Sequence, residues 1–305
     1  MTRPTPPSLL HRRRFLKTAT AGLGIGVAGT LTGRGKAAAG DDADKKLIVG
    51  LVTDVHYADA DTHGTRHYRD SLGKLEEAVD AFNRLEASFV VELGDLVDAG
   101  PSKEHDIKFL GEVDRVYRRF RGPRYYVLGN HCLHALTKTE FLTHSGSPVK
   151  KSFHSFDHGG RHFVILDANF KQDGTPYSAG NFTWTDTSIP APVQKWLAED
   201  LKRAGAKKTF VFLHQNLHDE KNAHGVKNAP QVRRILESAG NVAAVFQGHM
   251  HTGGYVTMGG IYYCTLKAMV EGAGLESNAY AVALIDRDGQ PRLEGFGRQP
   301  DVSFG

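Results

Sequence analysis

The chain has 305 residues, of which 40% are hydrophobic and 24% charged, and its formal net charge is +4. This length suits one large domain or two small ones, and the composition is ordinary for a soluble globular protein. Two cysteines exclude a disulfide-dense fold, and we expect Cys132 and Cys264 to be buried free thiols, with one disulfide between them as the alternative.

Residues 1–39 have the pattern of an export signal. A basic run at residues 12–17 precedes a weakly apolar, Gly-rich run at residues 18–32 and three alanines at residues 37–39. The arginine pair followed by Phe-Leu-Lys resembles a twin-arginine (Tat) signal, which implies export by the Tat machinery to the periplasm or the extracellular space. The alternative is an uncleaved membrane helix, but the run is shorter than the roughly 20 apolar residues of a span. We therefore expect no stable membrane anchor.

The basic charge of the whole chain belongs to this leader. Residues 1–39 contain seven basic residues and no acidic ones, which leaves 31 Lys and Arg against 34 Asp and Glu, a net charge of −3. The sequence after the leader therefore gives no indication of a nucleic-acid-binding surface.

From residue 46 onward, short apolar runs alternate with amphipathic ones. Buried strands are predicted at residues 47–53, 89–93, 125–128, 162–167, 209–213 and 242–246, followed by a hairpin at 254–266 and a strand at 279–285. Apolar residues at helical spacing predict helices within 72–85, 107–120, 193–201 and 232–236, and residues 172–192 read as a long surface loop. This order indicates one α/β (α+β) domain at residues 46–290, with two packed sheets between helices and a C-terminal tail at 291–305.

Five of these strands are each followed by a short polar motif. In chain order the motifs contain Asp54 and His56; Asp95 and Asp98; Asn130 and His131; His214; and His249 and His251. Ligand sites gather at the carboxyl ends of strands in open α/β sheets. Bringing so many carboxylates and imidazoles together is costly unless something neutralises and coordinates them.

These groups could coordinate two metal ions, which would neutralise the carboxylates. Carboxylate and amide oxygens together with neutral imidazoles suit Mn, Fe or Zn, and one carboxylate can bridge two metals about 3.5–4 Å apart. Such a pair would activate a bridging hydroxide for attack on a small phosphorylated substrate. Each motif alone is weak, because a single buried His214 is more often structural and Gly-Asn-His can be a simple turn. The signal is five motifs in order, each after a strand.

The series D-x-H, G-D-x-x-D, G-N-H, H and G-H-x-H resembles the calcineurin-like metallophosphoesterase superfamily over residues 47–284. The resemblance implies a four-layer αββα sandwich. It also implies that His131 protonates the leaving oxygen or steadies the transition state, and that Asp98 orients a ligand. The metal ligands that it implies are Asp54, His56 and His251 for the first metal, Asn130, His214 and His249 for the second, and Asp95 as the bridge.

One position departs from the family pattern. The third motif usually ends in an acidic residue that orients the catalytic histidine, whereas this chain has Cys132. A thiol is a poor partner for an imidazolium, so we expect either that another residue assists the leaving-group step or that the substrate has a leaving group that needs little protonation, such as that of a diphosphate.

A narrower resemblance points to the same chemistry. Residues 57–59, 66–72 and 128–133 resemble the manganese-dependent ADP-ribose/CDP-alcohol diphosphatases, although His56 stands where that branch often has Gln. The resemblance implies cleavage of nucleoside diphosphate-linked substrates. Arg66 and Arg69 are candidates to bind the second phosphate, and the alternative is that they cap the helix near Asp70 or pair with surface acids.

We therefore predict a dinuclear phosphoesterase that hydrolyses a phosphodiester or phosphoanhydride, with His131 as the acid. The alternatives are an exported phosphomonoesterase with the same site, and a metal-binding protein that has lost catalysis. In the long loop, Phe182 and Trp184 are candidates to stack on a base or to anchor the loop. His218 and His224 follow the fourth motif in a polar loop, where we expect them to be solvated, with contact to the substrate as the alternative.

Overall fold

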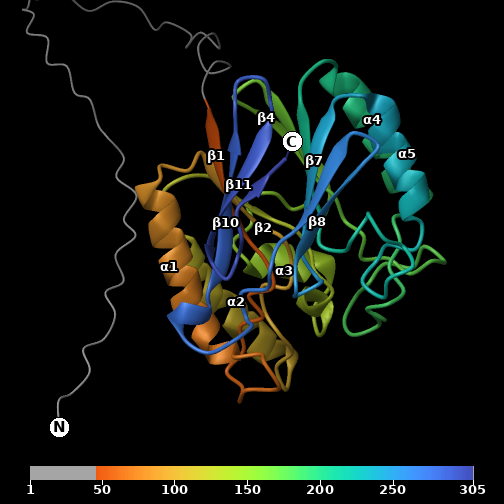
Figure 1. Ribbon diagram of the computed structural model, residues 1–305. Helices are drawn as coiled ribbons and strands as arrows, with labels where there is room; N and C mark the ends of the chain where they lie inside the picture. Colours follow the sequence, from red (N-terminus) through yellow and green to blue (C-terminus); the bar gives the residue numbers. More distant parts are fainter. Residues whose placement is uncertain (1–45, 305) are drawn as a thin grey trace, which may run out of the picture. The chain divides into compact units, whose positions relative to one another are not determined.

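The computed structural model describes residues 46–304, which form two six-stranded β-sheets packed between helices (Figure 1). The strand order is β12-β11-β10-β1-β2-β3 in the first sheet and β4-β5-β6-β7-β9-β8 in the second. The strands are β1 (Leu47–Val52), β2 (Phe89–Glu92), β3 (Arg124–Tyr126), β4 (His154–His158), β5 (Arg161–Ile165), β6 (Thr209–Phe212), β7 (Val242–Gln247), β8 (Gly254–Met258), β9 (Ile261–Thr265), β10 (Ala279–Ile285), β11 (Pro291–Gly297) and β12 (Val302–Ser303). The predicted export signal lies outside the described residues.

Five α-helices and three short 3-10 helices complete the described part of the chain. The α-helices are α1 (Ser71–Arg84), α2 (Lys103–Tyr117), α3 (Lys138–His144), α4 (Ala191–Ala204) and α5 (Ala229–Ala239). The 3-10 helices are Tyr68–Asp70, His131–Leu133 and Leu275–Ser277. Within residues 46–304, no helix is both long enough and apolar enough to cross a bilayer. Both cysteines are buried and free, as predicted.

Side-chain alternation along the strands separates three apolar layers. Leu51 of β1 and Phe212 of β6 belong to the core between the two sheets. The neighbouring residue Val52 packs beneath α1 and α2, and Val211 packs beneath α4 and α5. Since successive side chains of a strand point to opposite faces, each sheet is buried on both sides. This is the predicted αββα sandwich, with α1 and α4 on opposite sides of the sheets in Figure 1.

The strands that carry the motifs run in the same direction. Strands β1, β2 and β3 are parallel neighbours in the first sheet, and β6 and β7 are parallel neighbours in the second. Their carboxyl ends therefore lie along one edge of each sheet, which is where the polar motifs begin.

The predicted domain boundary at residue 290 is wrong. Strand β11 pairs with β10 along its full length, and β12 pairs with β11, so the segment assigned to a tail completes the first sheet. This edge of the sheet is partly exposed and contains Gly295 and Gly297, so its sequence lacks the apolar run of a buried strand. The edge strand β4 was also missing from the prediction because it is only partly buried, and α3 was missing because its seven residues are too few to show a helical repeat of apolar residues.

Candidate metal centre

The seven predicted metal ligands converge at the carboxyl ends of the five strands. Side chains from three strands of the first sheet meet side chains from two strands of the second. Six of the seven ligands are buried, and His251 is partly exposed. Asp54, His56 and His251 form one group of potential ligands, and Asp95, His214 and His249 form another. The structure therefore brings together residues that are up to about two hundred positions apart in the sequence.

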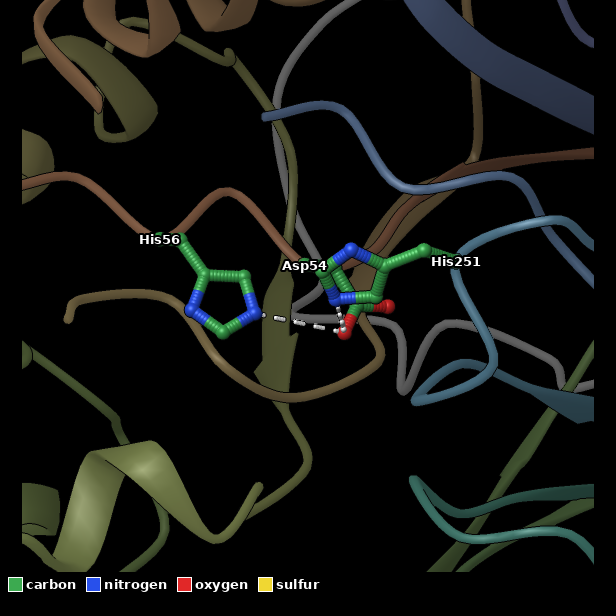
Figure 2. Close-up of side chains that lie close together, drawn as sticks. All are labelled: Asp54, His56 and His251. Atoms are coloured by element: carbon green, nitrogen blue, oxygen red, sulfur yellow. Dashed lines mark ion pairs between the residues drawn. The ribbon is translucent and has the colours of Figure 1, made fainter. Parts of the chain in front are cut away.

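The first group surrounds the carboxylate of Asp54. Its Oδ1 atom lies 3.5 Å from Nε2 of His56 and 3.4 Å from Nε2 of His251 (Figure 2). The other oxygen accepts hydrogen bonds from the Thr53 hydroxyl and from the backbone amide of His249. One carboxylate oxygen is thus held by the fold, and the other faces two imidazoles.

The second group surrounds Asp95. Its Oδ2 atom lies 3.1 Å from Nε2 of His214 and 3.5 Å from Nε2 of His56. The rings of His214 and His249 are 4.9 Å apart between centroids. Asp95 therefore stands between the two groups, which is the position that the family resemblance implies for a bridging carboxylate. Asn130 lines the same cavity as Asp95 and His249.

The backbone turns sharply at four of these residues. The φ angles are 51° at Asp54, 44° at His56, 58° at Asp95 and 68° at His249. Positive φ is unfavourable for residues with a Cβ and is often found at functional sites, where the surrounding structure maintains it. Backbone hydrogen bonds from Asp54 to Gly94 and from His56 to Asp95 maintain it here. The turning backbone lets Asp54 and His56 face one site, which an extended strand would prevent.

Two motif glycines are required by close approach. A Cβ atom on Gly129 would clash with the carboxylate and the backbone amide of Asp95. A Cβ atom on Gly248 would clash with the Thr53 hydroxyl and would crowd Asp54. Glycine at these positions allows the loops after β3 and β7 to pack against the two carboxylates.

Three of the ligand histidines form a hydrogen bond to an oxygen atom through Nδ1. Nδ1 of His214 lies 2.9 Å from the carbonyl oxygen of Leu93, which can only accept, so Nδ1 carries the proton. Nδ1 of His56 lies 3.0 Å from Asp98, and Nδ1 of His251 lies 2.6 Å from Glu271. In each ring the Nε2 atom then faces the two groups, as metal-binding imidazoles require.

Buried atoms without partners indicate that the site fits metal ions. Polar atoms buried in a protein interior are nearly always hydrogen-bonded. Here, buried ligand atoms of five of the seven residues have no hydrogen-bond partner. They are Asp54 Oδ1, His56 Nε2, Asn130 Oδ1, His214 Nε2 and His249 Nε2. Their chemistry is that of a Mn, Fe or Zn site, so the residues present fit the two metals that the sequence predicts.

The charges in the cluster are strongly interdependent. Burial lowers the pKa of His56, but the adjacent carboxylates of Asp54 and Asp98 outweigh burial and raise that pKa to about 10. Burial raises the pKa of Asp54, but the adjacent imidazoles of His251 and His56 outweigh burial and lower it to well below its usual range. Burial also lowers the pKa of His249, helped by the nearby charge of His214. An imidazole must be unprotonated at the nitrogen that binds a metal, so metal binding at this cluster would release protons and depend on pH.

His131 is oriented by Asp98 rather than by the residue that follows it. Oδ1 of Asp98 lies 3.0 Å from Nδ1 of His131, and Oδ2 lies 3.0 Å from Nδ1 of His56. Cys132 is fully buried in the apolar core beneath the first sheet. This geometry agrees with the alternative that another residue takes the place of the missing acid, because Asp98 of the second motif supplies the carboxylate. Nδ1 is engaged, so Nε2 of His131 is the nitrogen available to a substrate.

A cavity of about 410 Å³ opens over the cluster. It is lined by Arg66, Asp95, Asn130, His131, Trp184, His224, His249, Met250, His251 and Thr252. The Trp184 side chain is 42% exposed, and its ring lies 5.2 Å from that of His224. A larger groove of about 650 Å³ runs between α4 and α5, but it contains none of the predicted site residues.

The two candidate phosphate-binding arginines lie in different places in the structure. Arg66 lines the cavity, and its Nη1 atom lies 3.5 Å from Asp98. Arg69 does not line the cavity, and it pairs with Asp59 and Asp61 on the surface. Its position agrees with the alternative of pairing with surface acids, so the assignment of Arg69 to substrate binding is corrected.

Two further residues lie near the cluster. His224 was expected to be solvated, but it is half-buried in the cavity wall, with its ring 5.0 Å from that of His249, which agrees with the alternative of contact to the substrate. Glu271, which contacts His251, lies in a loop after β9 and belongs to none of the motifs. No pattern in the sequence marks Glu271, because its contact depends on how that loop packs.

Comparison with known proteins agrees with this geometry. Two relatives are manganese-dependent ADP-ribose/CDP-alcohol diphosphatases. The one from Arabidopsis thaliana is 26% identical, over 84% of this chain and 96% of the relative, and the one from Oryza sativa subsp. japonica is 25% identical, over 73% and 83%. A dimetal phosphatase from Danio rerio has the same fold, with a TM-score of 0.75 and 23% identity over 84% of this chain and 98% of that structure. Residues 48–253 match the calcineurin-like phosphoesterase family. The chain belongs to this family and is a metal-dependent hydrolase of phosphate ester bonds.

Proposed function

We propose that the protein hydrolyses the diphosphate bond of a nucleoside diphosphate-linked substrate, of the ADP-ribose or CDP-alcohol type. The proposal rests on the position of Arg66. This residue lines the cavity together with His131, and its guanidinium group lies close to Asp98, which also contacts His131. A second phosphate next to the one attacked would meet this cation. The names of the relatives from two plants support the same substrate class.

The two metals would be held by the seven ligands named above, with Asp95 between them. When bound, they supply Lewis-acid stabilisation of the phosphoryl oxygens and lower the pKa of a water so that it can attack phosphorus. His131 then protonates the leaving oxygen through Nε2. Asp98 keeps the ring in the required tautomer and stabilises its cationic form.

The aromatic wall of the cavity suits the nucleoside part of such a substrate. Trp184 packs against His224, which in turn packs against His249, and a large part of the indole remains exposed. An exposed aromatic face next to a phosphate-binding cation matches a base linked to a diphosphate.

A substrate panel with two matched arginine variants tests the proposal. The metal-loaded enzyme should hydrolyse ADP-ribose more efficiently than p-nitrophenyl phosphate or its bis-ester. Arg66→Ala should lower kcat/KM for ADP-ribose about 10-fold to 100-fold, since a hydrogen bond to a charged group contributes about 1.5–3 kcal/mol. Arg69→Ala should change it less than about twofold. A preference for monoesters would favour the exported phosphomonoesterase, and no turnover with Mn, Zn or Fe would favour the loss of catalysis.

We also propose that the protein is exported by the Tat pathway to the periplasm or the extracellular space. The support is the arginine pair in the leader, followed by a weakly apolar run and small residues. Replacing Arg12, Arg13 and Arg14 by Lys should retain the protein inside cells that export the wild type. Unchanged export of this variant would contradict the proposal.

A further inference from the structure

Glu271 lies in the loop between β9 and β10 and contacts a predicted metal ligand. Its Oε1 atom is 2.6 Å from Nδ1 of His251, and both side chains are 17% exposed. His251 is the ligand histidine that solvent reaches most, because His56 and His214 are fully buried. Core packing therefore constrains its ring less than the other rings, and a specific contact is needed to fix its direction.

The contact repeats a pattern seen at the other ligands. Asp98 holds Nδ1 of His56, and a backbone carbonyl holds Nδ1 of His214. In each case an oxygen acceptor fixes the proton on Nδ1, so the unprotonated Nε2 atom points toward the cluster. Glu271 occupies the same place for His251, whose Nε2 atom lies 3.4 Å from Asp54 (Figure 2).

We propose that Glu271 is a positioning residue for the first metal. It fixes the His251 tautomer that has its proton on Nδ1, it aims Nε2 at the Asp54 side of the cluster, and its charge makes Nε2 a better ligand. Glu271 acts through His251 and is not itself a ligand. The inference rests on the proposed two-metal site and is independent of which phosphate ester the enzyme cleaves.

The fold holds the backbone of Glu271 rigidly in place. The buried ammonium group of Lys74 on α1 donates to the carbonyl oxygens of Glu271 and of two neighbouring residues. Arg298, which follows β11, also donates to the Glu271 carbonyl. In addition, the amide of Val270 donates to the carbonyl of Asp54, which ties the loop to the metal-binding strand end. Two cations far apart in the sequence thus fix the loop that presents the carboxylate.

Glu271 is also joined to the phosphate-binding side of the cavity. Its backbone forms an isolated antiparallel bridge with Arg66, and the amide of Gly272 donates to the carbonyl of Thr65. The residue that orients His251 therefore also supports the segment that presents Arg66. The side chain of Glu271 contacts His251, which belongs to the group with Asp54 and His56, so Glu271 should affect the first metal much more than the second.

The test is a calorimetric titration of metal-free protein with Mn²⁺, followed by thermal unfolding of the metal-free proteins. The wild type should bind two ions. Glu271→Leu should bind one of them about 10-fold to 100-fold more weakly and the other with unchanged affinity. Glu271→Gln keeps an oxygen acceptor for Nδ1 and should lose less. Glu276→Gln, on the exposed part of the same loop, is the matched control and should behave as the wild type.

Three results would overturn the inference. The first is unchanged affinity for both ions in Glu271→Leu. The second is equal weakening of both ions together with a lower Tm of the metal-free variant, because Glu271 would then only support the loop. If Glu271→Leu does not fold, Glu271→Gln decides, because binding of both ions by Glu271→Gln with the same affinity as the wild type and Glu276→Gln would contradict positioning. A wild type that binds fewer than two ions would overturn the two-metal site itself, which separates the two failures.

Discussion

Asp98 accepts a hydrogen bond from Nδ1 of His131 at 3.0 Å through one carboxylate oxygen, and its other oxygen lies 3.0 Å from Nδ1 of His56. One carboxylate therefore orients both the predicted acid and a predicted metal ligand. Burial raises the pKa of Asp98, but the hydrogen bonds from His131 and His56 outweigh burial and lower it far below its usual range. Asp98 thus stays ionised in the buried site and can stabilise a cationic His131.

Replacing Asp98 should impair catalysis in a way that depends on the leaving group. Asp98→Asn should lower kcat about 100-fold or more for a substrate with a poor leaving group, because general acid catalysis contributes about 10²–10⁴-fold. The loss should be smaller for bis(p-nitrophenyl) phosphate, whose leaving group needs little protonation. Steady-state kinetics with both substrates measures the difference, and equal losses on both would argue that Asp98 acts only through His56.

Cys132 provides the control for this prediction. Its side chain is buried in the apolar core, and burial raises the pKa of its thiol well above the usual range. Cys132→Ala should therefore leave kcat within about threefold of the wild type while costing some stability, since it removes only a small buried group. A large selective loss of kcat in this variant would restore a catalytic role for position 132.

Removing Trp184 should weaken binding of substrates that carry a base. Stacking on an aromatic side chain contributes about 1–3 kcal/mol per base, so Trp184→Ala should raise KM for ADP-ribose by about 5-fold to 100-fold. Trp184→Phe keeps an aromatic face and should retain most of the affinity. A dialkyl diphosphate, which has no ring to stack, should show little change. If KM rises equally for both substrates, the indole acts by supporting His224 instead.

Metal removal should lower stability as well as abolish activity. A ligand that binds only the folded state stabilises it by about 2.7 kcal/mol at a free concentration 100 times its Kd. Adding Mn²⁺ to chelator-treated protein should therefore raise Tm in proportion to the logarithm of its concentration. Asp95→Asn should show a smaller rise, because it weakens the carboxylate placed between the two groups. A Tm that does not respond to any of Mn, Zn or Fe would contradict the metal site.

A buried histidine outside the metal centre, His162, gives a separate pH dependence. Hydrogen bonding to Asp200 raises the pKa of His162, burial lowers it, and bonding to Asp157 raises it further, with a net shift upward. Because the folded pKa lies above the unfolded one, the stabilisation is complete below the unfolded pKa of about 6.5 and is lost as the pH rises through the folded pKa.

The corresponding variant is His162→Gln. It should lower the free energy of unfolding by about 1.5–3 kcal/mol near pH 5.5 and by less near pH 9. Urea unfolding of the variant and the wild type at both pH values measures the difference, with exposed His144→Gln as the control. A loss that grows toward alkaline pH would show that the sign of the shift is wrong.

Most of the fold and of the candidate site could be predicted from the sequence, for identifiable physical reasons. Buried strands such as β1 and β6 are apolar on both faces, so they stand out as short runs, and the motifs follow them directly. The strand β11 was missed because it lies near the edge of its sheet and is partly exposed, so it has no such run. Glu271 was missed as a site residue, and His224 was expected to be solvated, because loop packing alone brings them to the cluster and the sequence does not encode that packing as a local pattern.

We expect two metal ions to be held by seven side chains from five strand ends. The most direct test is a crystal structure of Mn-loaded protein with anomalous diffraction data at the manganese edge. Two anomalous peaks are expected, one bounded by Asp54, His56 and His251 and the other by Asn130, His214 and His249, with the carboxylate of Asp95 between them. A single peak, or peaks bound by other residues, would contradict the account.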